Sequence, residues 1–215
     1  MEKIKIIIID ADGTIFDSMP GYAKIFSDLL FERYNIPKKE SNHFLISTAG
    51  TAIEQQIQQM LEKYNFKNEN IMKLGHEFYE LARNENLKFF PDVIPALKKL
   101  KGFRKFLSSG NQQDLLNMRV KQYNLKNYFE EWLGFGKNYG KSEHIEYLIK
   151  KLNLTKEEFA KMTIYVADAS TDMKIAKSYN ITSFGRIGTL TKKELLEAGA
   201  SFAVKDFDEI VQYLE

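Results

Sequence analysis

Residues 6–17 read IIIIDADGTIFD, and the junction in the middle of this stretch carries most of the information in the chain. The run from Ile6 to Ile9 is continuous and β-branched, which is typical of a strand buried on both faces of a parallel sheet. Asp10 and Asp12 follow at once, and Gly13 lets the backbone turn. Buried carboxylates without partners are costly, so acids at this place need a function or a counter-charge. Because ligands bind at the carboxyl ends of strands in open α/β sheets, the acid pair is predicted to face a site.

The composition excludes several classes of protein. The 215 residues include 31 Lys and Arg against 29 Asp and Glu, and this balance argues against a surface dedicated to nucleic acid. The absence of cysteine excludes disulfides and thiolate chemistry. The longest apolar run is too short to span a bilayer, and its charged neighbours do not resemble a secretory signal. We therefore expect a cytoplasmic protein with no membrane or nucleic-acid partner. We also expect a monomer.

Helical periodicity dominates the segment after the acid pair. Apolar residues recur at helical spacing in three stretches, at residues 22–34, 53–64 and 71–81. Pro37 is expected to stop the first of these helices. We find no convincing strand between residues 18 and 88, so this block is predicted to be a helical bundle of its own.

From Pro91 onward, short apolar runs alternate with helical patterns. Strands are predicted at residues 103–107, near Trp132 and Leu133, and at 163–167, 181–184 and 202–204. This alternation indicates a parallel sheet with right-handed crossovers. The predicted fold class is α/β, with a Rossmann-like parallel sheet core and helices on both faces. The core is assigned to residues 1–16 and 89–215, and an all-helical cap domain, residues 17–88, is inserted after the first strand.

Three further polar segments lie after predicted strands. The segment 108–111, Ser-Ser-Gly-Asn, offers hydroxyls and backbone N–H groups at a helix start, an arrangement suited to anions. Lys141 begins another helix, and Asp168 and Asp172 bracket a loop-to-helix turn. If all four segments lie at one edge of the sheet, they form a pocket with oxygen ligands, a cation and an anion-binding turn.

The order of these motifs resembles the haloacid dehalogenase (HAD) superfamily, and specifically its phosphatase branch with a helical cap, similar to phosphoglycolate phosphatases and β-phosphoglucomutases. The likeness covers nearly the whole chain. Each motif alone has low specificity, but four in the same order after the same elements are strong evidence. The matching positions are Asp10, Asp12, Gly13 and Thr14 for the first motif, Ser108 or Ser109 for the second, Lys141 for the third, and Asp168 and Asp172 for the fourth.

The resemblance implies a phosphatase of small phosphorylated metabolites that depends on Mg²⁺. Asp10 would attack phosphorus and form an aspartyl-phosphate. Asp12 would protonate the leaving alkoxide and then take a proton from the attacking water. Lys141 would neutralise charge on Asp10 and on the phosphoryl group. The family's phosphate-binding positions match Thr14, Ser108, Ser109 and Lys141, and its metal-binding positions match Asp10, Asp12 (by its carbonyl), Asp168 and, through water or by orienting the loop, Asp172.

Three positions depart from the family pattern. Ala167 and Asp92 stand where the family often has glycine, and Lys141 lacks the proline that often follows its counterpart. Lys137 is therefore a rival for the lysine role. For the second motif, Ser108 is favoured over Ser109.

The same residues also have simpler, structural interpretations. The first acid pair could be a capped turn, Asp172 a helix cap and Lys141 a solvated lysine. A calcium loop is excluded because Gly13 falls at position four rather than six, and a P-loop because Phe135 occupies its first glycine. The three histidines have no ligand-like spacing, and each is expected to be a partly exposed side chain.

Two functions besides a phosphatase stay open at this point. A phosphomutase would keep the same acids and return the phosphoryl group to an isomeric sugar, and a non-catalytic phosphate-binding protein could use the same scaffold. The substrate is expected to be selected by the cap. We expect its polar turn, residues 47–51, to face the pocket, because this turn is small and interrupts two apolar helices.

Overall fold

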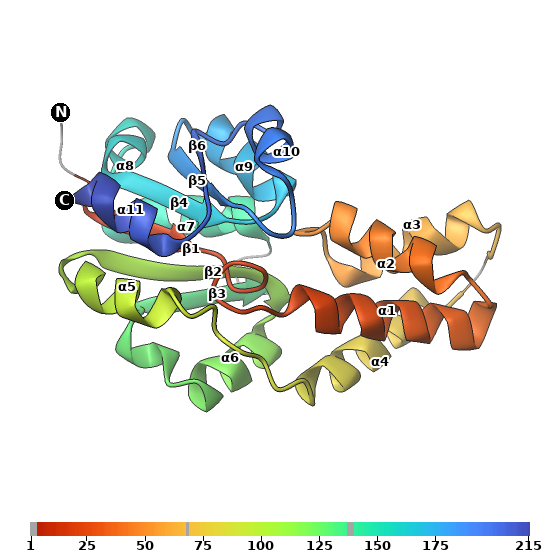
Figure 1. Cartoon of the computed structure of the whole chain (residues 1–215). Coiled ribbons are helices and arrows are strands. Elements are labelled where there is room, and N and C mark those ends of the chain that lie inside the picture. The colour runs from red at the N-terminus through yellow and green to blue at the C-terminus, as the bar shows by residue number, and fades with distance from the viewer. Residues whose placement is uncertain (1–3, 68, 137–139) are drawn as a thin grey trace.

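The sheet and its helices agree with the predicted fold class. The computed structural model describes residues 4–67, 69–136 and 140–215. In these ranges six strands form one sheet in the order β3-β2-β1-β4-β5-β6, and every neighbouring pair is parallel (Figure 1). The strands are β1 (Ile6–Ile9), β2 (Arg104–Gln112), β3 (Glu131–Phe135), β4 (Thr163–Ala167), β5 (Thr182–Arg186) and β6 (Phe202–Val204). The predicted parallel α/β sheet is confirmed, and β1 lies near its centre between β2 and β4.

The four isoleucines of β1 pack into two separate cores. Ile7 and Ile9 belong to the core on one face of the sheet, and Ile6 and Ile8 belong to the core on the other. All four are at most 2% exposed, as expected for a central strand covered on both faces. Each buried isoleucine contributes about 1.5–3 kcal/mol to folding, so β1 is a firm base for the acids that follow it.

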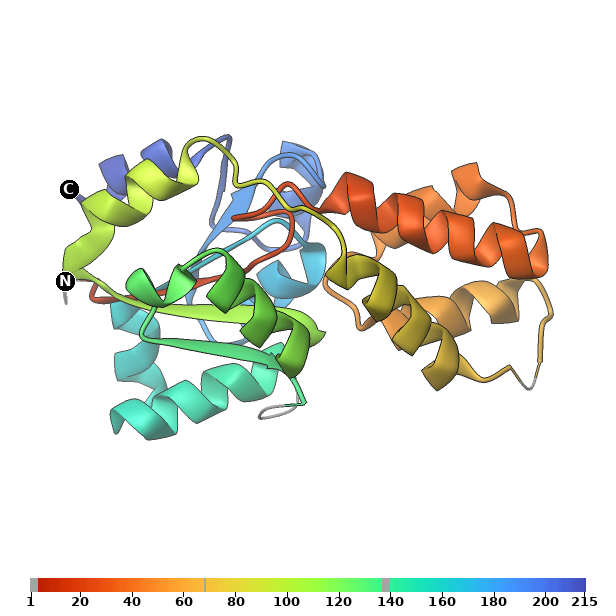
Figure 2. The same ribbon diagram turned by 90° about the horizontal axis from the view of Figure 1, so that it is seen from below.

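Helices cover both faces of the sheet (Figure 2). The face of Ile7 packs against α5 (Val93–Lys99), α6 (Gln113–Gln122) and α11 (Phe207–Leu214). The opposite face packs against α7 (Lys141–Leu152), α8 (Lys156–Met162), α9 (Ser170–Ser178) and α10 (Lys192–Glu197). Short 3₁₀ turns, Leu100–Gly102 and Leu125–Asn127, lead towards β2 and β3.

Two elements differ from the predictions for this region. Helix α8 has no predicted counterpart, because its seven residues are too few to show a periodic pattern, although Thr155 and Glu158 form a capping box at its start. Strand β2 extends through Gln112, five residues beyond the predicted end. Its last part keeps an extended backbone next to β3 after an irregularity between Ser108 and Gln112.

The segment between β1 and α5 is helical, as predicted. In its described part it contains α1 (Met19–Tyr34), α2 (Lys38–Ser47), α3 (Ile53–Lys63) and α4 (Ile71–Arg83), and no strand of the sheet comes from it. We call α1–α4 the insert. Helix α2 was not among the predicted stretches, because polar residues dominate it. Figure 1 shows the insert extending from the end of the sheet to which β1 points.

The two connections of the insert to the sheet lie side by side. The rings of Phe16 and Phe89 stack with centroids 4.8 Å apart, and the N–H of Asp17 donates to the carbonyl of Lys88. The apolar core of the insert is continuous with the core on the Ile7 face. Because this apolar core is shared, it does not mark a boundary between two domains. The division into a core and a cap domain at residues 17–88 is therefore a proposal. None of the helices in the described part of the chain has the length and apolar character needed to cross a lipid bilayer.

Candidate active site

A pocket of about 80 Å³ lies between the insert and the carboxyl ends of strands β1, β2 and β4. It is lined from the sheet side by acids, an amide and a lysine, and from the insert by mostly apolar side chains. The sheet side contributes Asp10, Asp12, Gly110, Asn111, Lys141 and Asp168, and the insert contributes Met19, Tyr22, Leu45, Ala49, Gly50, Thr51, Ile53, Gln56, Phe78 and Tyr79. Three of the predicted acids and the predicted lysine therefore share one pocket.

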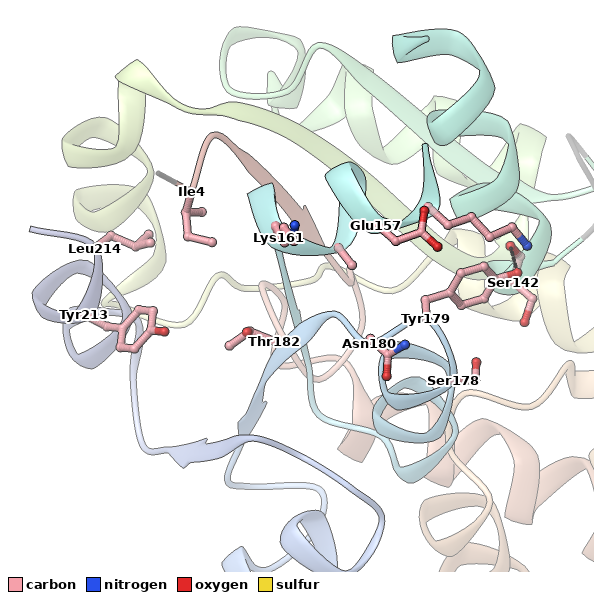
Figure 3. A pocket seen from close by; sticks show the side chains of 12 residues that line it. Ile4, Ser142, Glu157, Lys161, Ser178, Tyr179, Asn180, Thr182, Tyr213 and Leu214 are labelled. Atoms are coloured by element: carbon pink, nitrogen blue, oxygen red, sulfur yellow. Dashed lines mark hydrogen bonds between the residues drawn. The ribbon is translucent and has the colours of Figure 1, made fainter. Parts of the chain in front are cut away.

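A larger hollow of about 1340 Å³ lies elsewhere, beside Ile4, Tyr179 and Leu214 (Figure 3). Ile4 precedes β1 and Thr182 begins β5, so this hollow is at the amino ends of the strands. Among its described lining residues Glu157 is the one acid. Size alone does not identify a reaction centre, and the concentration of buried acids favours the smaller pocket.

Lys141 holds two acids together at the base of the pocket. Its Nζ lies 2.8 Å from Oδ1 of Asp10 and 2.7 Å from Oδ1 of Asp172, and all three side chains are at most 6% exposed. Burial raises the pKa of Asp10 well above its usual range; Lys141 opposes this rise, and Asp172 and Asp168 add to it. Burial would lower the pKa of Lys141, but the two carboxylates hold it well above its usual range. The lysine therefore stays charged, and the acids around it outnumber it.

Asp172 is fixed from behind by Tyr165. The Tyr165 hydroxyl donates to Oδ1 of Asp172 at 2.8 Å, while Lys141 also donates to Oδ2 at 2.9 Å. Asp172 is fully buried and does not line the pocket. Both of its oxygens face Lys141, so its arrangement suits positioning of the lysine.

Asp12 is oriented by an amide that the sequence analysis did not single out. Asn111 donates from Nδ2 to Oδ2 of Asp12 at 2.6 Å, while Oδ1 has no partner among the described residues. Burial raises the pKa of Asp12. The hydroxyls of Ser18 and Tyr22 oppose this rise, although neither makes a hydrogen bond of regular geometry within the described chain. A carboxyl group with a raised pKa is suited to proton transfer.

Asp168 accepts hydrogen bonds from two threonines. Thr14 donates to Oδ1 at 3.2 Å and Thr189 donates to Oδ2. Burial raises the pKa of Asp168 to about 6; the Thr189 hydroxyl opposes the rise and Asp172 adds to it. Gly13 has φ +70°, and a Cβ there would lie 1.9 Å from Oδ2 of Asp168, so glycine is required for the two acid motifs to meet.

The two predicted serines lie behind the pocket and do not line it. Ser108 Oγ and His144 Nδ1 share a hydrogen bond of 2.9 Å, and Ser109 Oγ accepts from the N–H of Asn111 at 3.1 Å. The expectation of a partly exposed side chain is wrong for His144, which is fully buried where α7 packs on the sheet. His43 and His76 are exposed. The rival lysine, Lys137, lies outside the described residues.

The predicted turn of the insert reaches the pocket in part. Ala49, Gly50 and Thr51 line it, while Ser47 is exposed to solvent. Among the described lining residues, Tyr22, Gln56, Tyr79 and Asn111 are polar groups to which the sequence analysis gave no role. Tyr22 fits the apolar stripe of α1, and Asn111 belongs to the recognised polar segment after β2.

The donor set fits a hard cation, although no three acidic, histidine or cysteine side chains of the described residues are arranged as a ready metal site. Asp10, Asp12 and Asp168 line the same pocket with Lys141 as the one cation among its described lining residues. Their pKa values are raised by burial, and those of Asp10 and Asp168 also by the neighbouring acids. Mg²⁺ prefers carboxylate and carbonyl oxygens and would supply the missing positive charge.

Known proteins resemble this chain over most of its length. The family model described as haloacid dehalogenase-like hydrolase matches residues 7–185. A phosphoglycolate phosphatase from Aliivibrio fischeri is 23% identical over 195 residues, which cover 85% of this chain and 84% of the relative. A crystal structure described as a predicted phosphatase from Clostridium acetobutylicum superposes with a TM-score of 0.83, at 22% identity and 99% coverage of both chains. A HAD hydrolase from Bacillus subtilis, solved bound to magnesium, superposes with a TM-score of 0.72 at 14% identity and full coverage of both chains. At these identities the structural likeness concerns the fold alone.

Proposed function

The chain belongs to the haloacid dehalogenase-like hydrolases, and on that premise we propose that it hydrolyses a small phosphate monoester through a phosphorylated Asp10. Its homologues support a phosphatase, a hydrolase of phosphate esters. The observation that carries the proposal is the contact between Asp10 and Lys141, 2.8 Å apart, in a pocket that also contains Asp12 and Asp168. This arrangement combines a nucleophile, an acid and a fixed cation.

In the first half of the reaction, a carboxylate oxygen of Asp10 attacks phosphorus. The P–O bond to the leaving group breaks, and Asp12 donates its proton to the departing oxygen. Lys141 screens the charge on Asp10 and on the phosphoryl oxygens as they approach. Asn111 keeps the Asp12 carboxyl group oriented through its 2.6 Å hydrogen bond. The products of this step are a free alcohol and a phosphorylated Asp10.

In the second half, a water molecule attacks the same phosphorus and gives a proton to Asp12. The P–O bond to Asp10 breaks, inorganic phosphate leaves, and both acids return to their starting states. The raised pKa of Asp12 supports both proton transfers, because its protonated and ionised forms then differ less in free energy near neutral pH.

The residues proposed to hold Mg²⁺ are Asp10, Asp168 and the backbone carbonyl of Asp12. Bound there, the ion would offset the charge of the phosphoryl oxygens, which otherwise repel the carboxylates. Asp172 acts on Lys141 rather than on the ion, because Lys141 and Tyr165 occupy its oxygens. Backbone N–H groups near Gly110 are the proposed contacts for the phosphoryl oxygens, since Gly110 lines the pocket.

The test is release of inorganic phosphate from a panel of phosphate esters, with Mg²⁺ and with EDTA, by the wild type and by Asp10→Asn. We expect turnover that requires the metal and falls on the order of a thousandfold or more in Asp10→Asn. Asp17→Asn is the matched control, because Asp17 is exposed and lies outside the pocket. Equal rates in Asp10→Asn and the wild type would reject the mechanism. An isomeric ester with no free phosphate would identify a phosphomutase instead.

A further inference from the structure

The insert side of the pocket carries no charged side chain among its described residues. It presents aliphatic and aromatic side chains, including Leu45, Ile53 and Phe78, together with the amide of Gln56 and the hydroxyl of Thr51. Gln56 donates from Nε2 to the carbonyl and the hydroxyl of Thr48, at 2.9 and 2.8 Å. This donor is therefore already engaged within the insert. The leaving group of an ester bound at Asp10 would face this wall, and the wall offers a carboxylate no partner of opposite charge.

The carboxylate of Glu54 has the largest charge effect on the aromatic part of this wall. Tyr79 is 2% exposed and lines the pocket. Burial raises the pKa of its phenol, and Glu54 and Asp12 raise it further, as does Asp114, which is paired with Arg83. Glu54 accepts from Gln112 at 3.3 Å, and its second oxygen has no partner among the described residues. A carboxylate on the leaving group would therefore enter a region of like charge.

Besides Lys141, a second cation, Arg119, lies near enough to act on Asp12 and Tyr22, but it does not line the pocket. Its guanidinium donates to the carbonyls of Ala82 and Glu85, and to the side chain of Gln122. These contacts hold its two terminal nitrogens at the end of α4, and its Nε has no partner among the described residues.

Two polar atoms of the pocket, the Tyr22 hydroxyl and Oδ1 of Asp12, act on each other without forming a regular hydrogen bond. The Tyr22 hydroxyl and Oδ1 of Asp12 are both buried, and neither has a regular hydrogen bond within the described chain. Tyr22 is 5% exposed, so water is largely excluded from its side chain. Buried polar groups of this kind are normally satisfied, and a ligand with a neutral polar group would satisfy the phenol.

The pocket is also small, because the insert closes tightly on the sheet. Its volume of about 80 Å³ is far below the roughly 300–1,000 Å³ of typical ligand sites. Thr171 donates to the carbonyl of Ala49, and a Cβ at Gly50 would lie 2.0 Å from the Thr171 hydroxyl. With the insert in this position, only a few non-hydrogen atoms fit beyond the phosphoryl group.

We propose that the substrate, if the proposed function holds, is an ester whose leaving group is small, uncharged and polar, and that the Tyr22 hydroxyl binds it. The Glu54 carboxylate beside Tyr79 disfavours a second negative charge on that group. Tyr22 is thus a specificity-determining residue, supplied by the insert.

The test compares two esters that differ in one group. Phosphoglycolate and phosphoglycolamide have nearly the same shape, but the first carries a carboxylate where the second carries a carboxamide. We expect the wild type, with Mg²⁺, to hydrolyse phosphoglycolamide with a kcat/KM at least about tenfold higher. Equal rates, or a preference for phosphoglycolate, would overturn the inference while phosphate release still supported the proposed function. Failure to release phosphate from any ester of the panel would overturn both.

The role of Tyr22 is tested with ethyl phosphate, whose leaving group has no second polar group. In Tyr22→Phe, the ratio of kcat/KM for phosphoglycolamide to that for ethyl phosphate should fall about three- to tenfold. The matched control is Tyr123→Phe, because the Tyr123 hydroxyl also lacks a partner among the described residues and lies outside the pocket lining. That control should keep the wild-type ratio. An unchanged ratio in Tyr22→Phe would remove Tyr22 from the proposal.

Discussion

Two buried ion clusters in this molecule differ in their charge balance. In one, Arg186 at the end of β5 meets Asp92 through two hydrogen bonds of 2.7 and 2.9 Å. In the other, Lys141 contacts both Asp10 and Asp172, and two further acids lie in or beside the same pocket. Burial would raise the pKa of Asp92, but Arg186 and the N–H of Phe207 outweigh it and lower this pKa. The pKa of Asp10 is instead raised well above its usual range.

The difference separates a structural ion pair from the proposed reaction centre. Asp92 precedes α5, Arg186 ends β5, and the N–H of Phe207 begins α11, so the balanced pair joins three elements. Arg186 also lies 4.0 Å from the centre of the Phe90 ring. The Lys141 cluster keeps unbalanced negative charge that a bound metal ion would compensate. Excess charge held in place by the fold is typical of functional sites.

Removing the cation from each cluster gives the largest predicted effects. Lys141→Met and Arg186→Met leave buried and half-buried carboxylates, respectively, without their cation and should lower the free energy of unfolding by up to about 3–5 kcal/mol. Only Lys141→Met should also lower the kcat of the folded enzyme, by about 10²–10³-fold. Denaturant unfolding and phosphate release at a temperature where both variants are folded would measure the two effects.

The outcome for Arg186→Met decides whether the two clusters are independent. The folded Arg186→Met protein should have a kcat within a few fold of the wild-type value, because Arg186 and Asp92 lie outside the pocket lining. A loss of kcat as large as that of Lys141→Met would show that the balanced pair also supports the reaction centre, and the comparison would fail.

The sequence predicted the acid cluster better than the ion pair, for a physical reason. Asp10, Lys141 and Asp168 each follow directly on a strand or begin a helix, so the topology of a parallel sheet brings them together without further information. The Arg186–Asp92 pair joins positions 94 residues apart, and neither residue belongs to a recognisable motif. The departure from the family pattern at Asp92 was visible in the sequence, but its partner was not.

The side-chain partners within the site were harder to predict than its members. Asn111, Thr189 and Tyr165 act through contacts with Asp12, Asp168 and Asp172, and each contact depends on a rotamer that the sequence does not specify. Likewise, Ser108 lies in the predicted place at the end of the apolar part of β2. Because strand residues alternate between faces, its hydroxyl points to His144 on α7.

The contribution of the Arg186–Asp92 pair to the stability of the fold should fall at acid pH. The pKa of Asp92 in the folded state lies below its ordinary value of 3.8, so its contribution is present above that value. It is lost as the pH falls through the folded-state pKa, because the unfolded chain then binds the proton more tightly. At pH 7, Asp92→Asn should be less stable than the wild type by about 1–3 kcal/mol.

The measurement is the free energy of unfolding of wild type and Asp92→Asn in parallel between pH 7 and pH 3. The difference between the two should shrink below about pH 4. Comparing the proteins at each pH cancels the titration of the site acids, which both proteins share. A difference that stays constant across this range would mean that Asp92 gains no stability from its charge.

The smallest predicted effect comes from the hydroxyl that holds Asp172. Tyr165→Phe removes one donor from a fully buried carboxylate that Lys141 still contacts, so the fold should lose about 1–1.5 kcal/mol. Tyr147→Phe is the matched control, because the Tyr147 hydroxyl also donates to an acid, Glu131, at 3.0 Å, but on a partly exposed surface. That control should change stability by less than about 0.5 kcal/mol. If Tyr165 positions Lys141 through Asp172, its variant should also lower kcat by up to about tenfold without changing KM, whereas a purely structural role would leave kcat of the folded enzyme unchanged.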